Sequence, residues 1–305
     1  MSAENQFESA ACDLCSSERR KEVYLSPYSK DMAQDISLYT ATTDRFSGYG
    51  RIVKCLDCGL VYTNPRPAPA TLEKSYTAYR DEDYLEESSC RSINAHLCLN
   101  TIKHFAPRGR LLEIGSSVGY FLNAARLDFD ARGIEPSAWA CEIARGKFRL
   151  EISNCGFAGF ESPAEYFDAV VMLDVIEHAS SPKFFVKKAA GMLKRGGLLY
   201  LITPDIGGLA AKILGGCWWG LRPSHIHYFS RATMRRLLEE CGFEIKLCKS
   251  YGRIFSYSYW HGRLKNYPAF VTAPISKTIS LLGIGDKPLY IDTRDTMEIC
   301  AIKTR

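Results

Sequence analysis

The regular alternation of strand-like and helix-like segments after residue 110 constrains the fold most. Short apolar runs rich in Leu, Ile and Val recur there, and each is separated from the next by a segment long enough to form a helix. Parallel strands require such crossover segments, whereas antiparallel strands can be joined by tight turns. The pattern therefore predicts an α/β fold with a doubly wound, mostly parallel sheet. The expected strands are residues 110–114, 131–135, 168–174, 198–202, 243–250 and 297–302.

Start and stop signals place the helices between these strands. Ser137 and Ser230 are expected N-caps, and Pro182 opens a further helix that the pair Gly196–Gly197 would end. A long N-terminal segment also has a helical pattern, which Pro107–Gly109 would end. The expected helices are residues 71–105, 120–127, 138–148, 182–195 and 231–241.

Ligands of such sheets bind beyond the carboxyl ends of the strands, close to the first strand. The loop after the first expected strand contains Gly115 and Gly119, which let the backbone approach a ligand closely. Glu135 ends the second expected strand, where an acid can bind both hydroxyls of a ribose. Taken alone, this pattern could hold NAD. An acid precedes the loop at Glu113, however, and its charge favours a cationic ligand over a pyrophosphate.

Two pairs of cysteines near the N-terminus have the spacing of a metal site. Each pair is separated by two residues, and the pairs lie about 40 residues apart, as in four-thiolate zinc sites. Gly59 follows the last of them and suits the sharp turn that directs backbone amides at the sulfurs. Four protein ligands leave no open position, so the expected zinc is structural. The expected ligands are Cys12, Cys15, Cys55 and Cys58.

Composition and charge exclude several classes of protein. The chain has 305 residues, 46% of them hydrophobic, which is enough for one large core and a smaller unit. No apolar run reaches the roughly 18 residues of a membrane span, and the polar N-terminus does not resemble a secretory signal. We therefore expect a cytoplasmic protein. The net charge is +5, yet residues 1–70 carry eight basic and nine acidic residues, which argues against a nucleic-acid-binding ribbon.

Four segments together resemble the successive motifs of class I S-adenosylmethionine-dependent methyltransferases. The resemblance covers residues 109–250 and the closing strand, and it implies a Rossmann-like seven-stranded sheet whose last strand is antiparallel. The cysteine pairs, with the segment Gly59–Arg66, resemble the zinc-ribbon branch of this family, whose members often modify sugars or natural-product intermediates. The four segments are Leu112–Phe121, Gly133–Ser137, Phe167–His178 and Leu193–Ile202.

The resemblance also implies roles for individual residues in binding the cofactor. Residues of the first loop would surround the methionine portion, and Glu135 would bind the ribose. Asp174 would line the pocket near the sulfonium, and Phe157 would contact the adenine. This sequence departs from the family in one position, because Ser117 stands where the family has the middle glycine of the loop. The first-loop residues are Glu113, Gly115, Ser117 and Gly119.

Methylation of an oxygen or carbon requires a base with a suitable pKa, for which histidine is the natural candidate. His178 follows the 168–174 strand at the expected mouth of the site. His225 lies in a segment that resembles the lid of the zinc-ribbon relatives, where a histidine at this position acts on the acceptor. Either histidine could be the base. His227 would point away from His225 if the segment is extended.

The C-terminal part offers candidates for acceptor recognition. Trp218 and Trp219 either form an apolar lid over the site or fill the core. The segment Tyr251–Tyr267 is rich in aromatic residues and would overhang the pocket or complete the core.

These observations predict four regions in the chain. They are a zinc-ribbon module (1–70), a helical linker or cap (71–108), a cofactor-binding domain (109–250), and an insertion with the closing strand (251–305). The expected function is transfer of a methyl group from S-adenosylmethionine to a small molecule, such as a sugar or secondary metabolite. An RNA methyltransferase and a non-catalytic interaction protein are the alternatives, and the acceptor and the oligomeric state stay open.

Overall fold

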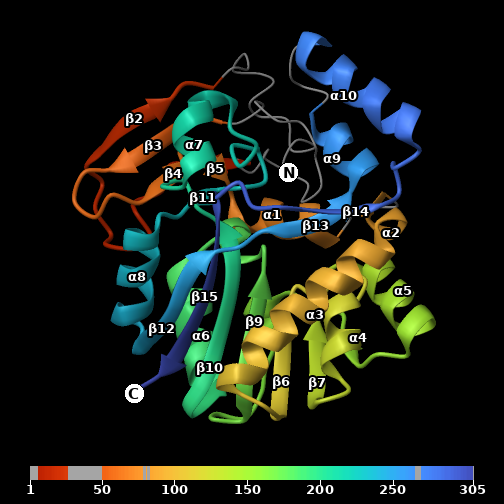
Figure 1. Cartoon of the computed structure of the whole chain (residues 1–305). Coiled ribbons are helices and arrows are strands. Elements are labelled where there is room, and N and C mark those ends of the chain that lie inside the picture. Colours follow the sequence, from red (N-terminus) through yellow and green to blue (C-terminus); the bar gives the residue numbers. More distant parts are fainter. Residues whose placement is uncertain (1–5, 27–49, 78–79, 81–82, 265–268, 305) are drawn as a thin grey trace, which may run out of the picture.

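The computed structural model describes residues 6–26, 50–77, 80, 83–264 and 269–304 (Figure 1). Its centre is a seven-stranded sheet with the order β12-β15-β10-β9-β6-β7-β8. Neighbouring strands from β10 to β8 are parallel, whereas β15 is antiparallel to both β10 and β12. The expected Rossmann-like sheet with an antiparallel closing strand is therefore confirmed. The strands are β6 (Gly109–Ile114), β7 (Phe129–Ile134), β8 (Ile152–Ser153), β9 (Phe167–Leu173), β10 (Leu193–Pro204), β12 (Phe243–Ser250) and β15 (Thr296–Lys303).

Helices cover both faces of the sheet because successive strand residues point to opposite sides. Leu111 of β6 faces a cluster with helices α3 and α4, whereas Leu112 faces a cluster with α6 and α8. Both leucines are fully buried. In Figure 1, α3 crosses in front of the sheet and α6 lies behind it. The helices around the sheet are α3 (Ser88–Phe105), α4 (Tyr120–Ala125), α5 (Ala138–Phe148), α6 (Pro182–Met192) and α8 (Arg231–Glu240).

Two expected helices are shorter than the sequence pattern predicted. The helix opened by Pro182 ends at Met192 instead of continuing to Gly196, because the buried Leu193 already pairs with Phe167 as the first residue of β10. The strand then passes through an irregularity before its regular pairing resumes at Leu198. The expected helix over residues 71–105 is divided into α1 (Pro69–Thr77), α2 (Asp83–Glu86) and α3.

The strands of the N-terminal ribbon share a sheet with a strand from much later in the sequence. Strands β2, β3 and β4 of the ribbon form a four-stranded sheet together with β11 (His227–Tyr228), in the order β11-β4-β3-β2. Strand β11 comes from the region that was predicted to bind the cofactor. The ribbon also contacts α6, whose Lys183 amide donates to Asp13 Oδ2 at 2.8 Å. Residues beyond the expected boundary at 70 therefore take part in the ribbon. Its strands are β1 (Phe7–Glu8), β2 (Arg20–Tyr24), β3 (Ile52–Cys55), β4 (Val61–Thr63) and β5 (Arg66–Pro67).

The insertion between β12 and β15 lies above the sheet, with α10 at the top right of Figure 1. Its strands β13 and β14 form an antiparallel pair, and β13 also contacts α3. Within the described part of the chain, no helix is long and apolar enough to cross a membrane. The insertion elements are β13 (Arg253–Ser256), α9 (Tyr257–Arg263), α10 (Ala269–Leu282) and β14 (Pro288–Ile291). The described residues also form α7 (Leu209–Leu214) and the short 3₁₀ turns η3 (Phe157–Gly159), η4 (Ile176–His178) and η5 (Gly215–Cys217).

Candidate active site

A large cavity lies at the carboxyl ends of β6, β7 and β9. Its volume is about 1730 Å³, which exceeds the roughly 300–1,000 Å³ of a typical single-ligand pocket. Its lining comes from the loops after these three strands, and from α3, the segment before β11 and the insertion. The cavity is therefore large enough to hold two ligands side by side.

Hydrogen bonds to Glu135 fix the loop after β6. One carboxylate oxygen of Glu135 accepts from the Ser117 amide at 2.9 Å, and the other accepts from the Ser137 amide at 2.8 Å. Ser117 adopts a φ of 47°, in the left-handed region that normally favours glycine. Ser117 therefore adopts a backbone conformation that favours glycine, the residue found at this position in the methyltransferase family that the sequence resembles.

Several buried polar atoms of this loop have no hydrogen-bond partner within the described residues. They are Glu113 Oε2, Ser116 Oγ and Ser117 Oγ, and all three residues line the cavity. Burial raises the pKa of Glu113 well above its usual range, and the nearby Glu135 charge adds to this. Buried polar groups normally find partners, and each one that does not costs about 1–3 kcal/mol. The set fits a ligand that brings hydrogen-bond donors and positive charge.

Gly119 and Phe157 differ in their relation to the cavity. Gly119 is not among the residues that line it, and a Cβ there would meet Leu150 Cδ1 at 2.5 Å. Its φ of 86° and this close packing account for the glycine without a ligand contact. Phe157 does line the cavity and packs edge-to-face on Phe185, with ring centroids 5.1 Å apart. Gly119 therefore does not itself line the cavity, and its expected place beside the methionine portion stays a prediction.

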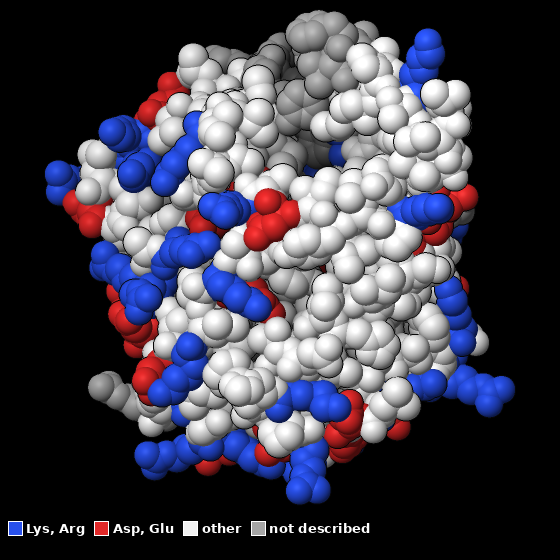
Figure 2. Space-filling view, viewed as in Figure 1, with Lys and Arg blue, Asp and Glu red and all other residues white. Residues whose placement is uncertain are grey.

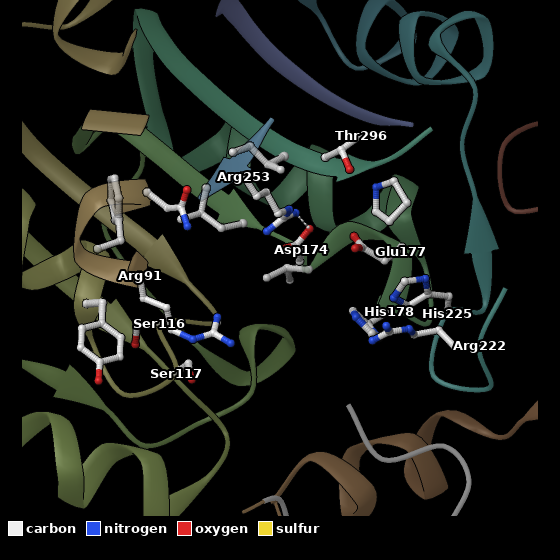
Figure 3. Close-up of a pocket in the computed structure, with 18 of the residues that line it drawn as sticks. Arg91, Ser116, Ser117, Asp174, Glu177, His178, Arg222, His225, Arg253 and Thr296 are labelled. Carbon is white, nitrogen blue, oxygen red and sulfur yellow. Dashed lines mark hydrogen bonds and ion pairs between the residues drawn. The ribbon is translucent and has the colours of Figure 1, made fainter. Parts of the chain in front are cut away.

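Asp174 lies at the cavity directly after β9, where the resemblance placed it. Its carboxylate accepts from Arg253 Nη2 at 2.6 Å (Figure 3). Asp174 has a φ of 54°, so the chain turns sharply at this residue. The carboxylate is therefore held in the cavity by an arginine from the insertion.

His178 and His225 contact each other on the side of the cavity that lies away from the β6 loop (Figure 3). His178 Nδ1 lies 2.8 Å from the Ser224 carbonyl oxygen, and His225 Nδ1 lies 2.9 Å from the Gly220 carbonyl oxygen. The two rings pack edge-to-face with centroids 4.8 Å apart. Because a carbonyl only accepts, each Nδ1 carries the proton and each Nε2 keeps a lone pair. Both side chains are therefore oriented as proton acceptors.

Glu177 joins the histidines to form a buried cluster (Figure 3). One ligand atom from each of Glu177, His178 and His225 lies within 4.8 Å of the others. Glu177 Oε2 accepts from Thr203 Oγ1 at 2.9 Å, whereas Oε1 has no partner among the described residues. Burial, with the Asp174 charge, raises the pKa of Glu177 to about 8. Burial also lowers the pKa of His178 to about 4 and that of His225 well below its usual value.

The two tryptophans that were predicted either to form a lid or to fill the core have different surroundings. Trp218 is 1% exposed and belongs to the core, whereas Trp219 lines the cavity. Both indole nitrogens donate to Asp295 Oδ2 at 2.6 Å. His227 is buried beside Phe229 and is not among the residues lining the cavity, in agreement with its expected orientation away from His225.

Roles for Glu177 and for the arginines of the cavity were not predicted from the sequence. Glu177 stands next to His178, so this adjacency was an available signal. Arg91 and Arg253 lie far apart in sequence, and their pattern carried no such signal. The arginines that line the cavity are Arg80, Arg91, Arg222, Arg253 and Arg263.

The four ribbon cysteines converge on one point. Their sulfurs lie within 4.8 Å of one another, with Cys12 Sγ 3.3 Å from Cys58 Sγ and Cys15 Sγ 3.6 Å from Cys55 Sγ. Sulfurs about 2.3 Å from one zinc ion would lie about 3.8 Å apart. Burial alone would raise the pKa of Cys55, but the backbone amides of Cys58 and Asp57 lower it to about 7. The donor set therefore fits a zinc ion.

The chain is similar to curated O-methyltransferases over part of its length. A curated ubiquinone biosynthesis O-methyltransferase from Bradyrhizobium sp. is 29% identical over 128 residues, which cover 39% of this chain and 48% of that protein. A second, from Chelativorans sp., is 31% identical over 104 residues, covering 31% and 40%. The chain thus spans about half the length of the curated relatives it matches.

A solved structure and a sequence family extend the comparison. The crystal structure of an S-adenosylmethionine-dependent methyltransferase from Archaeoglobus fulgidus superposes with a TM-score of 0.51 at 18% identity, covering 73% of this chain and all of that one. This likeness supports the fold alone. The sequence profile of the methyltransferase domain matches residues 87–247, more than half of the chain. The chain belongs to the methyltransferase domain family.

Proposed function

We propose that this protein transfers a methyl group from S-adenosylmethionine to an oxygen, or alternatively a carbon, of a small-molecule acceptor. One observation carries the proposal: partnerless polar atoms of the β6 loop and two oriented histidines border the same cavity. When bound, the cofactor would supply an electrophilic methyl group on a positively charged sulfur. The name of the curated relatives favours oxygen as the acceptor atom.

The cofactor would bind along the strand ends. Glu113 and the Ser117 hydroxyl would receive the methionine portion, because Glu113 Oε2 and Ser117 Oγ are buried without a partner among the described residues and the site favours positive charge. Glu135 would bind the ribose hydroxyls through lone pairs not used by its two backbone amides. Phe157 would offer an aromatic surface to the adenine.

The acceptor would bind between the cofactor and the histidine pair. An unprotonated Nε2 of His225 or His178 would take the proton of the acceptor hydroxyl, and the backbone carbonyls at Nδ1 would hold the ring in this tautomer. The shape of the cavity would align the acceptor and exclude water. Carboxylate and imidazoles are also ligands for divalent cations, but the nearby positive charge of Arg222 disfavours one here.

The RNA-methyltransferase alternative has less support. On the face shown in Figure 2, basic and acidic side chains are interspersed, and no continuous basic band crosses the described residues there. Nucleic-acid-binding surfaces usually gather basic residues on one face. The ribbon cysteines would hold a structural zinc, because four thiolates leave no open position for catalysis.

Calorimetric titration of the zinc-replete protein with S-adenosylmethionine and S-adenosylhomocysteine tests the proposal. We expect micromolar binding that weakens by roughly tenfold to hundredfold in Glu135→Gln. Glu151→Gln, which removes an exposed carboxylate near β8, is the matched control and leaves binding unchanged. Absence of binding to both compounds in the wild type would favour the interaction-protein alternative.

A further inference from the structure

Helix α10 of the insertion is apolar in sequence and yet lies on the surface (Figure 1). Over residues 272–282 every side chain is exposed except those of Thr272 and Ile279, which are partly buried. Leu281 is 82% exposed and Leu282 is 61% exposed. The helix packs mainly on α9. Clustered apolar side chains that stay in contact with water usually mark a site of interaction.

The sequence of α10 has the pattern of a helix that lies in a membrane surface. Among its 14 residues Lys277 is the only charged one, and the other polar residues are serine and threonine. At 3.6 residues per turn, Lys277 shares one side of the helix with the serines at 276 and 280, whereas Ile275, Leu281 and Leu282 span the other side. Interfacial helices show this division, and 14 residues are too few for a span of about 20.

The charge of the insertion favours an anionic surface as the partner. Residues 251–291 carry five basic residues and one acidic residue, a difference of +4 within a chain whose net charge is +5. Arg253 and Arg263 line the cavity, whereas Lys277 and Lys287 are exposed at α10 and directly after it. In Figure 2 the surface over α10, at the upper right, is almost entirely white and shows no acidic side chain. Anionic lipids attract lysines in such positions.

The size of the helix argues against a second copy of the chain as its partner. A helix of 14 residues is about 21 Å long and offers a face about 10 Å wide, or about 200 Å². Stable protein interfaces take roughly 800 Å² from each partner. A bilayer needs no such matched area, because binding grows with each apolar side chain that enters it and each basic residue at its surface.

We propose that α10 docks this protein on an anionic phospholipid bilayer. Ile275, Leu281 and Leu282 would enter the headgroup region, and Lys277 would lie among the phosphates. Helix α9, on which α10 packs, also lines the cavity. Figure 2 shows a hollow next to the surface over α10. Docking would therefore hold the bilayer beside the cavity.

Co-sedimentation of the full-length, zinc-replete protein with lipid vesicles tests this inference. The vesicles contain either phosphatidylcholine alone or phosphatidylcholine and phosphatidylglycerol in equal amounts. We expect saturable binding to the mixed vesicles that weakens at least about fivefold without the anionic lipid and falls as salt rises. Amide hydrogen exchange should slow over residues 272–282 when the vesicles are added, and it should stay unchanged in α8.

Variants assign the binding to α10. The double change Leu281→Ser and Leu282→Ser should weaken vesicle binding at least about tenfold, and Lys277→Gln about threefold to fivefold. Leu127→Ser is the matched control, because Leu127 is 78% exposed and precedes β7, at the edge of the sheet opposite to the cavity. It should bind vesicles as the wild type does. An unchanged melting temperature and zinc content show that each variant is folded.

Four results would overturn the inference. They are failure of the wild type to sediment with either kind of vesicle, wild-type affinity in the double serine variant, an equal loss in Leu127→Ser, and self-association without vesicle binding. The last result would appear in sedimentation velocity as a dimer that the double serine variant does not form, and it would assign α10 to contact between two copies of the chain.

Discussion

The two halves of the cavity are built in different ways. The proposed cofactor half comes from the strands of the parallel sheet and the loops after them: Glu113 lies in β6, Glu135 directly follows β7 and Asp174 directly follows β9. The acceptor half joins α3, the segment before β11 and the insertion, and Asn94 is bonded to Ile254 across 160 residues. A parallel sheet thus fixes one half, whereas packing between distant segments fixes the other. Under the proposed function, the first half would bind the cofactor and the second would select the acceptor.

The ribbon belongs with the acceptor half. Strand β4 pairs with β11, and the Thr63 amide donates to the Ile226 carbonyl at 3.0 Å, directly after His225. The Ile226 amide in turn donates to the Glu177 carbonyl at 3.0 Å. Backbone hydrogen bonds therefore join strand β4 of the ribbon to the segments that carry both histidines.

The largest effect is expected from loss of the zinc site. Cys58→Ser should abolish stoichiometric zinc binding and lower the free energy of unfolding by several kcal/mol. Amide hydrogen exchange should accelerate at Thr63 and Ile226, whereas the affinity for S-adenosylhomocysteine should change less than about threefold. Cys248→Ser is the control, because this thiol lies in β12, outside the ribbon, and does not line the cavity. If the affinity for S-adenosylhomocysteine falls as strongly as hydrogen exchange accelerates at Thr63 and Ile226, the two halves of the cavity are not independent.

The next largest effect concerns the base. His225→Gln should lower kcat by roughly 10²–10⁴-fold and leave binding of S-adenosylhomocysteine unchanged, because the ring contacts only the acceptor half. The same measurement on His178→Gln identifies which histidine removes the proton, since the partner ring should have the smaller effect. Retention of full activity in both variants would rule out a histidine base.

The next prediction concerns how kcat/KM depends on pH, where a solvated base and a buried base differ by about tenfold in rate. An exposed histidine with a pKa near 6.5 would be about 90% protonated at pH 5.5, which would cost about tenfold in rate. Burial lowers the pKa of His178 to about 4 and that of His225 well below its usual value. Because a lowered pKa keeps the imidazole neutral, kcat/KM should stay flat from pH 7 to pH 5, below the pKa of about 8 at which the neighbouring Glu177 gains its proton. An acid limb near pH 6.5 would mean that the base is solvated or lies elsewhere.

The same division explains what could be predicted from sequence. Glu113 and Glu135 were predictable because strand, turn and helix signals are local, and the end of a parallel strand places its residues at the site. The place of Asp174 followed from the resemblance to the methyltransferase motifs. Arg91 and Arg263 were not, because their position depends on how the insertion packs on α3, and no local pattern encodes that contact. The end of α6 was misplaced for a related reason, since pairing of Leu193 with β9 overrides its helical pattern.

The smallest effect tests the one departure from the resembling family. Ser117→Gly should remove the strain of a positive φ and change the free energy of unfolding by at most about 1 kcal/mol. Arg149→Gly is the matched control, because Arg149 has a φ of 54° in the helix-ending position after α5 and does not line the cavity.

The two variants should differ in cofactor affinity. If the buried Ser117 hydroxyl binds the methionine portion, Ser117→Gly weakens binding of S-adenosylmethionine roughly threefold to tenfold, whereas Arg149→Gly leaves it unchanged. Calorimetry at one temperature and salt concentration separates these outcomes. Tighter binding in Ser117→Gly would mean that the serine only strains the loop. The cofactor half would then bind through Glu113 and Glu135 without help from the hydroxyl.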